Sequence, residues 1–390
     1  MNDLWTETGY VSLNKFEEQL CGDCVDIANG IDNTTTLVLA DGLGSGVKAN
    51  ILSTLTSKIL CTMISSGMKI EDCVETIANT LPVCNIRKIA YSTFSIVRVT
   101  NNTEVELIQF DNPLIIVLRS GKNYNYPKTS RMIADKTIFE SKFSIQLDDV
   151  VIAMSDGAVY AGVGRQLNFG WQRENIINYM ESMYYAGLSA KLIASLLVDE
   201  CNQLYGNEPG DDTTVAVIKI RKRQSVNILI GPPINQEDDQ KMMYLFFSKE
   251  GKKIICGGTT ANIASRYLNK SIDGSLDYVD CEIPPISYIE GVDLVTEGVI
   301  TISKVLQYTQ SYLDNEDLSA SWSVKKDGAS LIVKELLEYA TDIHFFVGKA
   351  INPAHQNPDL PITFSIKIRI IEELAKCLGE IGKQIKISYF

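Results

Sequence analysis

The stretch TTLVLADGLGSGVKA, residues 35–49, joins a β-branched apolar run to an acidic turn and then to a helical pattern. Its first part, Thr35 to Ala40, has the composition of a short buried strand, and Asp41-Gly42 places a carboxylate where that strand ends. A helix is expected next, because apolar residues then recur at the spacing of one helical face. The members of that face are Val47, Ile51, Leu55, Ile59 and Met63. We therefore expect an amphipathic helix that packs these five side chains on the core.

Three further acidic turns occupy comparable places: Gly22-Asp23, Ser155-Asp156-Gly157 and Gly210-Asp211-Asp212. Each lies where an apolar strand starts or finishes, so a rigid sheet would bring the carboxylates together. Carboxylates that converge without cationic partners repel one another and are poorly hydrated, so such a cluster is expected to bind cations. Oxygen ligands favour Mg²⁺ or Mn²⁺ over zinc. A single Asp-Gly is an ordinary turn, so this prediction depends on all four turns together.

The arrangement of strands and helices predicts two domains. Between the acidic turns, extended runs such as YSTFSIVRV (91–99) and VELIQF (105–110) are typical of hairpins, which indicates an α+β sandwich. After the polar segment RKRQS at 221–225, strand and helix patterns alternate instead, which favours a mostly parallel sheet. We expect a first domain at 1–223 and a smaller α/β domain at 224–390, each long enough to bury its own core.

One segment of the second domain has two interpretations. ICGGTTANI, residues 255–263, places two glycines between a strand and the start of a helix, a geometry that can hold an anion. It lacks the lysine of a Walker loop and the spacing of a dinucleotide fingerprint. A tight turn between strand and helix is the alternative.

Composition excludes several classes of protein. The 390 residues are 45% hydrophobic and 22% charged, as in globular chains, and the net charge of −12 disfavours nucleic-acid partners. We expect no membrane association, since no run of eighteen apolar residues occurs and the amino terminus does not resemble a signal peptide. Nine scattered cysteines are unlike a disulfide scaffold, so we expect reduced thiols and a cytoplasmic protein.

Taken in order, the acidic motifs resemble those of the metal-dependent protein phosphatases (PPM family), and most of all the bacterial branch typified by the sporulation stage II protein E phosphatase domain. The resemblance covers about Gly9 to Lys222. The motifs that carry it are CGDCVD (21–26), LADGLGSGVKA (39–49), MSDGAVYAG (154–162) and PGDDTTVAVIKI (209–220). The resemblance implies a four-layer α-β-β-α sandwich with a dimetal centre at one end of its two sheets.

Residue by residue, the resemblance assigns Asp23 and Asp41 as metal ligands, with Asp41 bridging two Mn²⁺ or Mg²⁺ ions. It assigns the carbonyl oxygen of Gly42 and the carboxylate of Asp156 to the same centre. The four catalytic carboxylates would be Asp23, Asp41, Asp156 and Asp211.

The last motif leaves its register open by one residue. The family pattern aligns Asp211 with the ligand, and Asp212 is the alternative. Asp26 lies three residues after Asp23 and is a weaker candidate for contact with a metal or its waters. No arginine that would grip substrate phosphate is evident near the amino terminus, as in the bacterial branch.

The resemblance implies a serine/threonine phosphoprotein phosphatase of bacterial signalling, in which water activated by two metals attacks phosphorus. A phosphorylated anti-sigma-factor antagonist is the candidate substrate. The resemblance also implies that the helix from Val47 couples the metal site to a regulator or to a dimer interface, and a homodimer is one such assembly. Two alternatives remain open. In the first, the chain is a non-catalytic sensor or binding module that keeps the phosphatase fold. In the second, the second domain, for which we expect a regulatory or partner-binding role, is a sensor of small anions.

Overall fold

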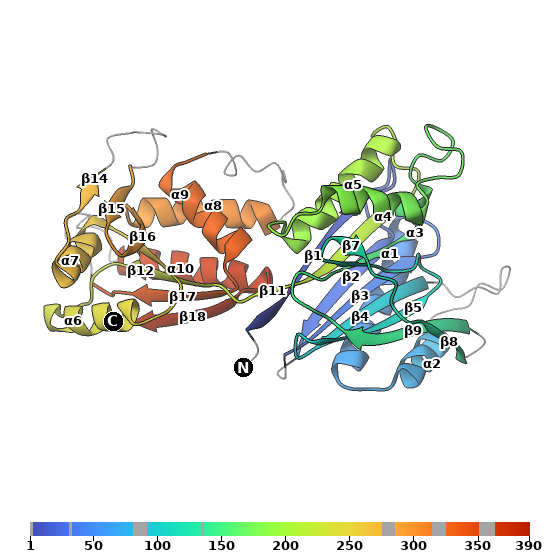
Figure 1. The fold of residues 1–390 in the computed structure, drawn as a ribbon, viewed down its shortest axis with the longest axis horizontal. Coiled ribbons are helices and arrows are strands. Elements are labelled where there is room, and N and C mark those ends of the chain that lie inside the picture. The colour runs from blue at the N-terminus through green and yellow to red at the C-terminus, as the bar shows by residue number, and fades with distance from the viewer. Residues whose placement is uncertain are drawn as a thin grey trace. The chain divides into compact units, whose positions relative to one another are not determined.

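The computed structural model describes residues 3–30, 33–80, 92–133, 136–274, 285–313, 325–350 and 363–390. The chain forms two compact units, Met1–Lys222 and Arg223–Phe390, which are described one at a time (Figure 1). Among the described residues, no helix has both the length and the apolar character needed to cross a bilayer.

The first unit contains two antiparallel sheets. One has five strands in the order β1-β11-β10-β6-β7, and the other has six in the order β2-β3-β4-β5-β9-β8. The strands of the first sheet are β1 Leu4–Leu13, β6 Ile116–Arg119, β7 Lys122–Asn123, β10 Val150–Met154 and β11 Thr213–Lys222. Those of the second are β2 Asp23–Asn29, β3 Thr34–Gly42, β4 Ser92–Thr100, β5 Glu104–Phe110, β8 Thr129–Ile133 and β9 Lys136–Ser144.

Helices cover the outer face of each sheet. Helices α1 (Gly46–Ser65) and α2 (Ile70–Thr80) pack on the six-stranded sheet, and α4 (Arg173–Met183) and α5 (Ala190–Leu204) pack on the five-stranded sheet. A separate apolar core lies between the two sheets, with residues such as Leu39 from one and Ala153 from the other. This arrangement is the four-layer α-β-β-α sandwich that the family resemblance implies, and α+β is the fold class, as the strand pattern predicts.

The predicted core face of α1 is wrong. Val47, Ile51 and Leu55 are 62%, 53% and 46% exposed, whereas Leu52 is 6% exposed and packs on the sheet. Residues spaced strictly by four advance about 40° around a helix at each step, so the stripe from Val47 to Met63 winds through about 160°. The stripe therefore starts in solvent and reaches the core only near its end. The buried face is lined by Ala49, Leu52, Ser53, Thr56, Ser57, Leu60, Cys61 and Ile64.

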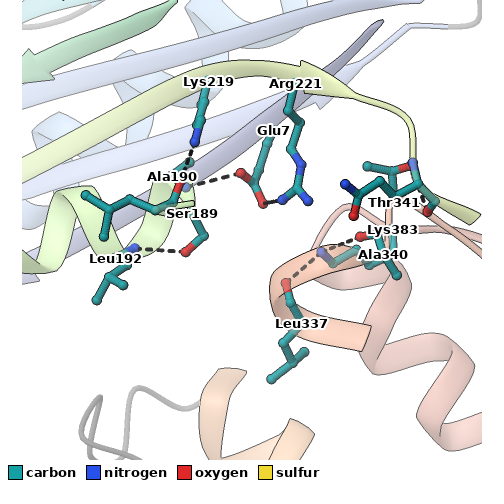
Figure 2. Close-up of polar contacts among 12 residues, drawn as sticks. Glu7, Ser189, Ala190, Leu192, Lys219, Arg221, Leu337, Ala340, Thr341 and Lys383 are labelled. Atoms are coloured by element: carbon teal, nitrogen blue, oxygen red, sulfur yellow. Dashed lines mark hydrogen bonds and ion pairs between the residues drawn. The ribbon is translucent and has the colours of Figure 1, made fainter. Parts of the chain in front are cut away.

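Side-chain contacts fix β1 to β11 and to the start of α5 (Figure 2). Glu7 accepts a hydrogen bond from Arg221 at 3.0 Å and another from the backbone N–H of Ala190 at 3.3 Å. Ser189 caps α5 by accepting from the N–H of Leu192 at 3.2 Å. The buried Lys219 donates to the carbonyl oxygen of Leu188 at 2.6 Å. These contacts join the edge strand β1, the strand β11 that ends the first unit, and the start of helix α5.

The second unit has one sheet, in the order β14-β15-β16-β13-β12-β17-β18. Neighbouring strands are parallel along the part of the sheet formed by β16, β13, β12, β17 and β18. Strand β15 is antiparallel to β16. The mostly parallel sheet expected from the sequence is therefore present. Its strands are β12 Ser225–Ile230, β13 Lys252–Cys256, β14 Asp273–Gly274, β15 Ser287–Ile289, β16 Val292–Thr296, β17 Asp342–Val347 and β18 Gln384–Tyr389.

Helices flank this sheet on both faces. Side chains of α6 and α7 share one apolar core with the sheet, and those of α8, α9 and α10 share another. Their bounds are α6 Asp239–Phe247, α7 Gly258–Leu268, α8 Val299–Leu313, α9 Gly328–Lys334 and α10 Thr363–Glu380. A π-helical turn, Glu335–Tyr339, follows α9, and the buried Lys383 donates to the carbonyl oxygens of Leu337 and Ala340 at 2.8 and 2.7 Å (Figure 2).

The connection between the units is short. The sequence predicts a polar break at 221–225, but β11 continues to Lys222 and β12 starts at Ser225. Arg223 and Asp342, both in the second unit, form an ion pair at 2.8 Å. Independent folding of 1–223 and 224–390 remains a prediction.

Candidate metal centre

Two of the predicted aspartates face each other within the six-stranded sheet. Asp23 begins β2, Asp41 lies next to the end of β3, and the two are partners in the antiparallel register. Leu39 and Leu37, two and four residues before Asp41, lie in the core between the sheets. Because side chains alternate along a strand, Asp41 and its partner Asp23 project from the same inner face.

The opposite sheet presents the other two acidic turns. Asp156 begins the short helix α3 (Asp156–Tyr160) directly after β10. The end of β10 is joined to the start of β11, because the hydroxyl oxygen of Ser155 accepts from the N–H of Thr214 at 2.8 Å and the Ser155 N–H donates to the Thr214 carbonyl at 3.0 Å. A Cβ on Gly157 would lie 2.1 Å from the carbonyl oxygen of Asp212, so glycine is needed for this close approach. Asp156 is therefore held beside the Asp211-Asp212 turn.

Electrostatics shows that the carboxylates from the two sheets converge. Burial raises the pKa of Asp41 well above its ordinary value, and the charges of Asp23 and Asp156 raise it further. The carboxyls of Asp41 and Asp156 lie close enough to share a hydrogen bond, which raises the pKa of Asp41 and lowers that of Asp156. Burial is nevertheless the larger effect at Asp156, where the net pKa shift is upward.

Asp23 is the most deeply buried of these carboxylates, at 4% exposure, and burial raises its pKa. Neither of its carboxylate oxygens has a hydrogen-bond partner within the described residues. The hydroxyls of Ser155 and Thr214 lie nearby and partly offset the pKa rise, but neither makes a hydrogen bond of standard geometry with it. A buried carboxylate that no protein donor satisfies is costly, which suits a cation ligand.

Asp211 and Asp212 have different surroundings. Asp211 is half-buried, and burial and the charge of Asp156 raise its pKa. Asp212 is buried, and its Oδ1 accepts from the backbone N–H of Lys15 at 3.0 Å. Its Oδ2 finds no hydrogen-bond partner among the described residues and lies 2.7 Å from the position of a Cβ on Gly22. The charge of Asp156 therefore acts on Asp211, whereas Asp212 lies on the side of Gly22.

Gly42 is required by the packing of α1. A Cβ at this position would lie 2.1 Å from the carbonyl oxygen of Ala49, so only glycine allows the first turns of α1 to pack here. The Gly42 N–H donates to the carbonyl oxygen of Gly22 at 3.1 Å, which joins the Asp41 turn to the Asp23 turn. The role of the Gly42 carbonyl as a ligand stays a prediction.

The structure does not bring Asp26 to this site. Asp26 is an odd number of residues from Asp23 along β2, so it projects from the opposite face. There it pairs with Lys58 of α1 at 3.2 Å. Sequence reasoning missed Asp111, whose charge raises the pKa of Asp156. The only sequence signal for Asp111 is its position after a strand in FDNP, which resembles an ordinary turn.

The donors fit Mg²⁺ or Mn²⁺ by their chemistry, because they are carboxylate oxygens and three of the buried ones, both of Asp23 and one of Asp212, have no partner in the described chain. Within the same residues, however, no three His, Cys, Asp or Glu side chains are close enough together to enclose a metal ion. The assignment of ligands therefore depends on convergence, burial and unsatisfied oxygens.

The comparison with protein families gives a match over most of the first unit. Residues 31–221 match the family model of stage II sporulation protein E. A comparison with curated proteins finds no match to this chain.

Three solved structures illustrate the similarity. The phosphatase domain of the cell-fate determinant SpoIIE from Bacillus subtilis is 19% identical with a TM-score of 0.44, over 57% of this chain and 95% of that one. A Bacillus subtilis structure of the SpoIIE PP2C phosphatase domain with a fragment of its regulatory domain is 19% identical with a TM-score of 0.49, over 56% and 63%. The RsbU and RsbW domains of a Mycobacterium tuberculosis protein are 15% identical with a TM-score of 0.47, over 62% and 68%.

A four-layer sandwich with acidic turns gathered at one end is the fold of the metal-dependent, PP2C-type protein phosphatases, and the first unit has this fold. Within that class, residues 31–221 belong to the stage II sporulation protein E-like family.

Proposed function

We propose that the first unit is an active phosphoprotein phosphatase that hydrolyses phosphoserine and phosphothreonine with two Mn²⁺ or Mg²⁺ ions. The observation that carries the proposal is the pair Asp23 and Asp41, opposite each other on the inner sheet face, with both Asp23 oxygens buried and unsatisfied by the described chain. Two divalent ions would lower the pKa of a shared water and neutralise charge on the phosphoryl oxygens.

In this proposal the ligands are those that the family motifs assign. Asp41 would bind both ions, since the charges of Asp23, Asp156 and Asp211 all act on it. Asp23 and Asp156 would bind from opposite sheets, and the Gly42 carbonyl would contribute from the turn. Asp211 completes the set, with Asp212 as the alternative in the same motif.

Two candidate nucleophiles within the described residues, Cys21 and His344, are poorly suited to that role. Burial raises the pKa of Cys21 to about 12, so this thiol stays protonated near neutral pH and is a poor nucleophile. His344 lies in β17 of the second unit, where its Nε2 hydrogen bonds with the Ser388 hydroxyl at 2.9 Å. Both observations favour attack by water over a covalent enzyme intermediate.

The finer expectations rest on the family alone. We propose that the substrate is a phosphorylated protein of a bacterial signalling pathway, with an anti-sigma-factor antagonist as the first to test. We also propose a cytoplasmic location and retain a homodimer as the assembly to examine.

The test measures hydrolysis of p-nitrophenyl phosphate and of a phosphothreonine peptide by the full chain with Mn²⁺, with Mg²⁺ and with EDTA. Hydrolysis that requires the metal and is lost in Asp41→Asn supports the proposal. Metal-induced stabilisation without hydrolysis of either substrate would instead identify the non-catalytic module.

A further inference from the structure

The second unit has a pair of helix starts at one edge of its sheet. β13 and β16 are parallel neighbours, with Cys256 opposite Thr296, and each leads directly into a helix. β13 is followed by Gly257 and α7, and β16 is followed by Glu297, Gly298 and α8. The N–H of Gly257 donates to the carbonyl oxygen of Thr296 at 2.8 Å, so the two turns are joined.

Glycine occupies the N-cap of both helices. The carbonyl of Gly257 accepts from the N–H of Ala261, and that of Gly298 accepts from the N–H of Ile302, so these are the first helical hydrogen bonds. A glycine cap has no side chain to accept from the next N–H groups. The first three N–H groups of each helix therefore receive no side-chain hydrogen bond from the N-cap residue, Gly257 or Gly298.

The two caps lie side by side. A Cβ on Gly298 would be 3.6 Å from the Cα of Gly257, and a Cβ on Gly257 would be 3.9 Å from the Cα of Gly298. The positive ends of two helix dipoles therefore meet at one place, and Gly258, Thr259 and Val299 beside the caps are exposed.

A second observation at this place indicates a ligand. Thr260 and Thr301 are each the third residue of their helix, and they are 1% and 0% exposed. The hydroxyl oxygen of each finds no hydrogen-bond partner in the described part of the chain. The Thr260 oxygen lies 3.5 Å from the position of a Cβ on Gly257, so it faces the seam between the two turns. An unpaired buried hydroxyl is costly, and a bound acceptor would satisfy it.

We infer that the paired starts of α7 and α8 bind the phosphate group of a hydroxyl-bearing small molecule. The amide N–H groups of both first turns and the Thr260 hydroxyl would donate to the phosphate oxygens. Glu297 belongs to the same site, because its Oε1 lies 3.9 Å from the position of a Cβ on Gly258 and its side chain is exposed. The Glu297 carboxylate repels a second anionic group on the ligand, but it can accept a hydrogen bond from a hydroxyl group. We therefore assign the ligand as a phosphate monoester with a hydroxyl that reaches Glu297.

The experiment titrates the full chain in EDTA with inorganic phosphate and with ribose 5-phosphate, by calorimetry. EDTA keeps divalent ions from the aspartates of the first unit, so any phosphate bound there through metal is removed from the signal. We expect both compounds to bind and ribose 5-phosphate to bind more tightly. An absence of binding by both at millimolar concentration overturns the site, and equal affinities overturn the role of Glu297.

Gly298→Asp is the decisive variant. Gly298 does not have a positive φ, and a Cβ there makes only ordinary contact, so a side chain fits. Aspartate is a better N-cap than glycine, so the helix should be at least as stable, while its carboxylate occupies the donors and repels phosphate. We expect phosphate binding to be lost in Gly298→Asp and retained within about threefold in Gly298→Ala. Equal binding by these two variants contradicts the inference.

Thr260→Val tests the hydroxyl. The side chains have the same shape, and the hydroxyl has no partner among the described residues, so the melting temperature should not fall. Loss of a hydrogen bond to a charged group should weaken phosphate binding about tenfold. Unchanged binding, or binding weakened only together with the melting temperature, would make Thr260 a structural residue and remove it from the site.

Discussion

Asp23 and Asp41 are register partners across β2 and β3, the first residue of one strand facing the last but one of the next. Two carboxylates placed in this way have Cβ atoms about 5 Å apart and repel each other. Burial of both side chains increases the cost, because little water screens the charges. The pair therefore destabilises the fold unless a cation or protons compensate, which makes it the natural target for experiments.

The first prediction concerns catalysis. Asp41→Asn or Asp156→Asn should lower Mn²⁺-dependent phosphatase activity about a thousandfold with the fold retained, because each removes a charge that would hold the metals. Turnover of p-nitrophenyl phosphate and circular dichroism measure the two effects. Asp26→Asn is the matched control, since Asp26 projects from the other face of β2 and pairs with Lys58, and it should keep nearly full activity. Wild-type turnover in either site variant would contradict the dimetal proposal.

The second prediction concerns pH and metal. In EDTA, the raised pKa values of Asp23 and Asp41 mean that the folded chain retains protons which the unfolded chain has released. Stability should therefore fall as the pH rises from about 5 to about 8. Melting temperatures in EDTA measure this, and the fall should be smaller in Asp41→Asn.

Mn²⁺ should reverse that loss at the upper end of the pH range, because it binds the ionised carboxylates of the folded state. Mass action gives roughly 2.7 kcal/mol at a hundredfold excess over the dissociation constant. An identical melting curve of fragment 1–223 with Mn²⁺ and with EDTA would count against an acidic site formed by the fold.

The third prediction settles the register of the last motif. Asp211 is half-buried and its pKa is raised by burial and by the charge of Asp156, whereas Asp212 accepts from the backbone N–H of Lys15. Asp211→Ala should therefore lower Mn²⁺ affinity more than Asp212→Ala does, and Asp212→Ala should lower the stability of the metal-free protein more. Calorimetric Mn²⁺ titration and thermal melting separate the two effects. The reverse order of metal affinities would make Asp212 the ligand.

The fourth prediction tests the corrected face of α1 with two adjacent apolar residues. Leu52→Ala should cost about 2–4 kcal/mol of unfolding free energy, because Leu52 is buried against the sheet. Ile51→Ala, at 53% exposure, should cost no more than about 0.5 kcal/mol. Urea unfolding of the two variants measures both values. Comparable costs would show that the exposed stripe is covered in solution.

The fifth prediction concerns the division of the chain. Residues 1–223 should be soluble and hydrolyse an aryl phosphate in Mn²⁺, and 224–390 should fold without phosphatase activity. The reason is that each unit has its own apolar cores. Expression of the two fragments, separately and together, provides the measurement. Fragments that are insoluble apart but assemble on co-expression would show that they share one core.

The sequence predicted the positions of the acidic turns because strand ends are locally encoded. An apolar run that stops at Asp-Gly fixes both the strand and the place of its carboxylate, as at β3 and Asp41. The buried face of α1 was not predictable in this way. Its core side includes Ser53, Thr56 and Ser57, whose hydroxyls bond to carbonyls of their own helix. Small polar residues that satisfy themselves locally resemble a solvent face in sequence.

Of the two paired helix starts in the second unit, the sequence predicted only the one at Gly257-Gly258. Gly257-Gly258 before a helix can be recognised, and the sequence left a phosphate site and a tight turn as alternatives. The contribution of Gly298 could not be predicted, because its position beside Gly257 follows from the pairing of β13 with β16, which are forty residues apart at Cys256 and Thr296. Long-range pairings of this kind carry little local signal.

The pairing of β1 with β11 bears on how the chain folds as it is made. The ten residues of β1 lie at the edge of their sheet, and their partner is β11, with Leu4 opposite Lys222 and Leu13 opposite Thr213. Synthesis delivers the amino-terminal strand first and its partner last, so β1 must wait through the translation of the rest of the first unit. Asp211 and Asp212 emerge in the same late segment. A nascent chain halted before Asp211 would therefore have an unpaired first strand and an incomplete acidic cluster, and the centre would be completed only as the unit closes.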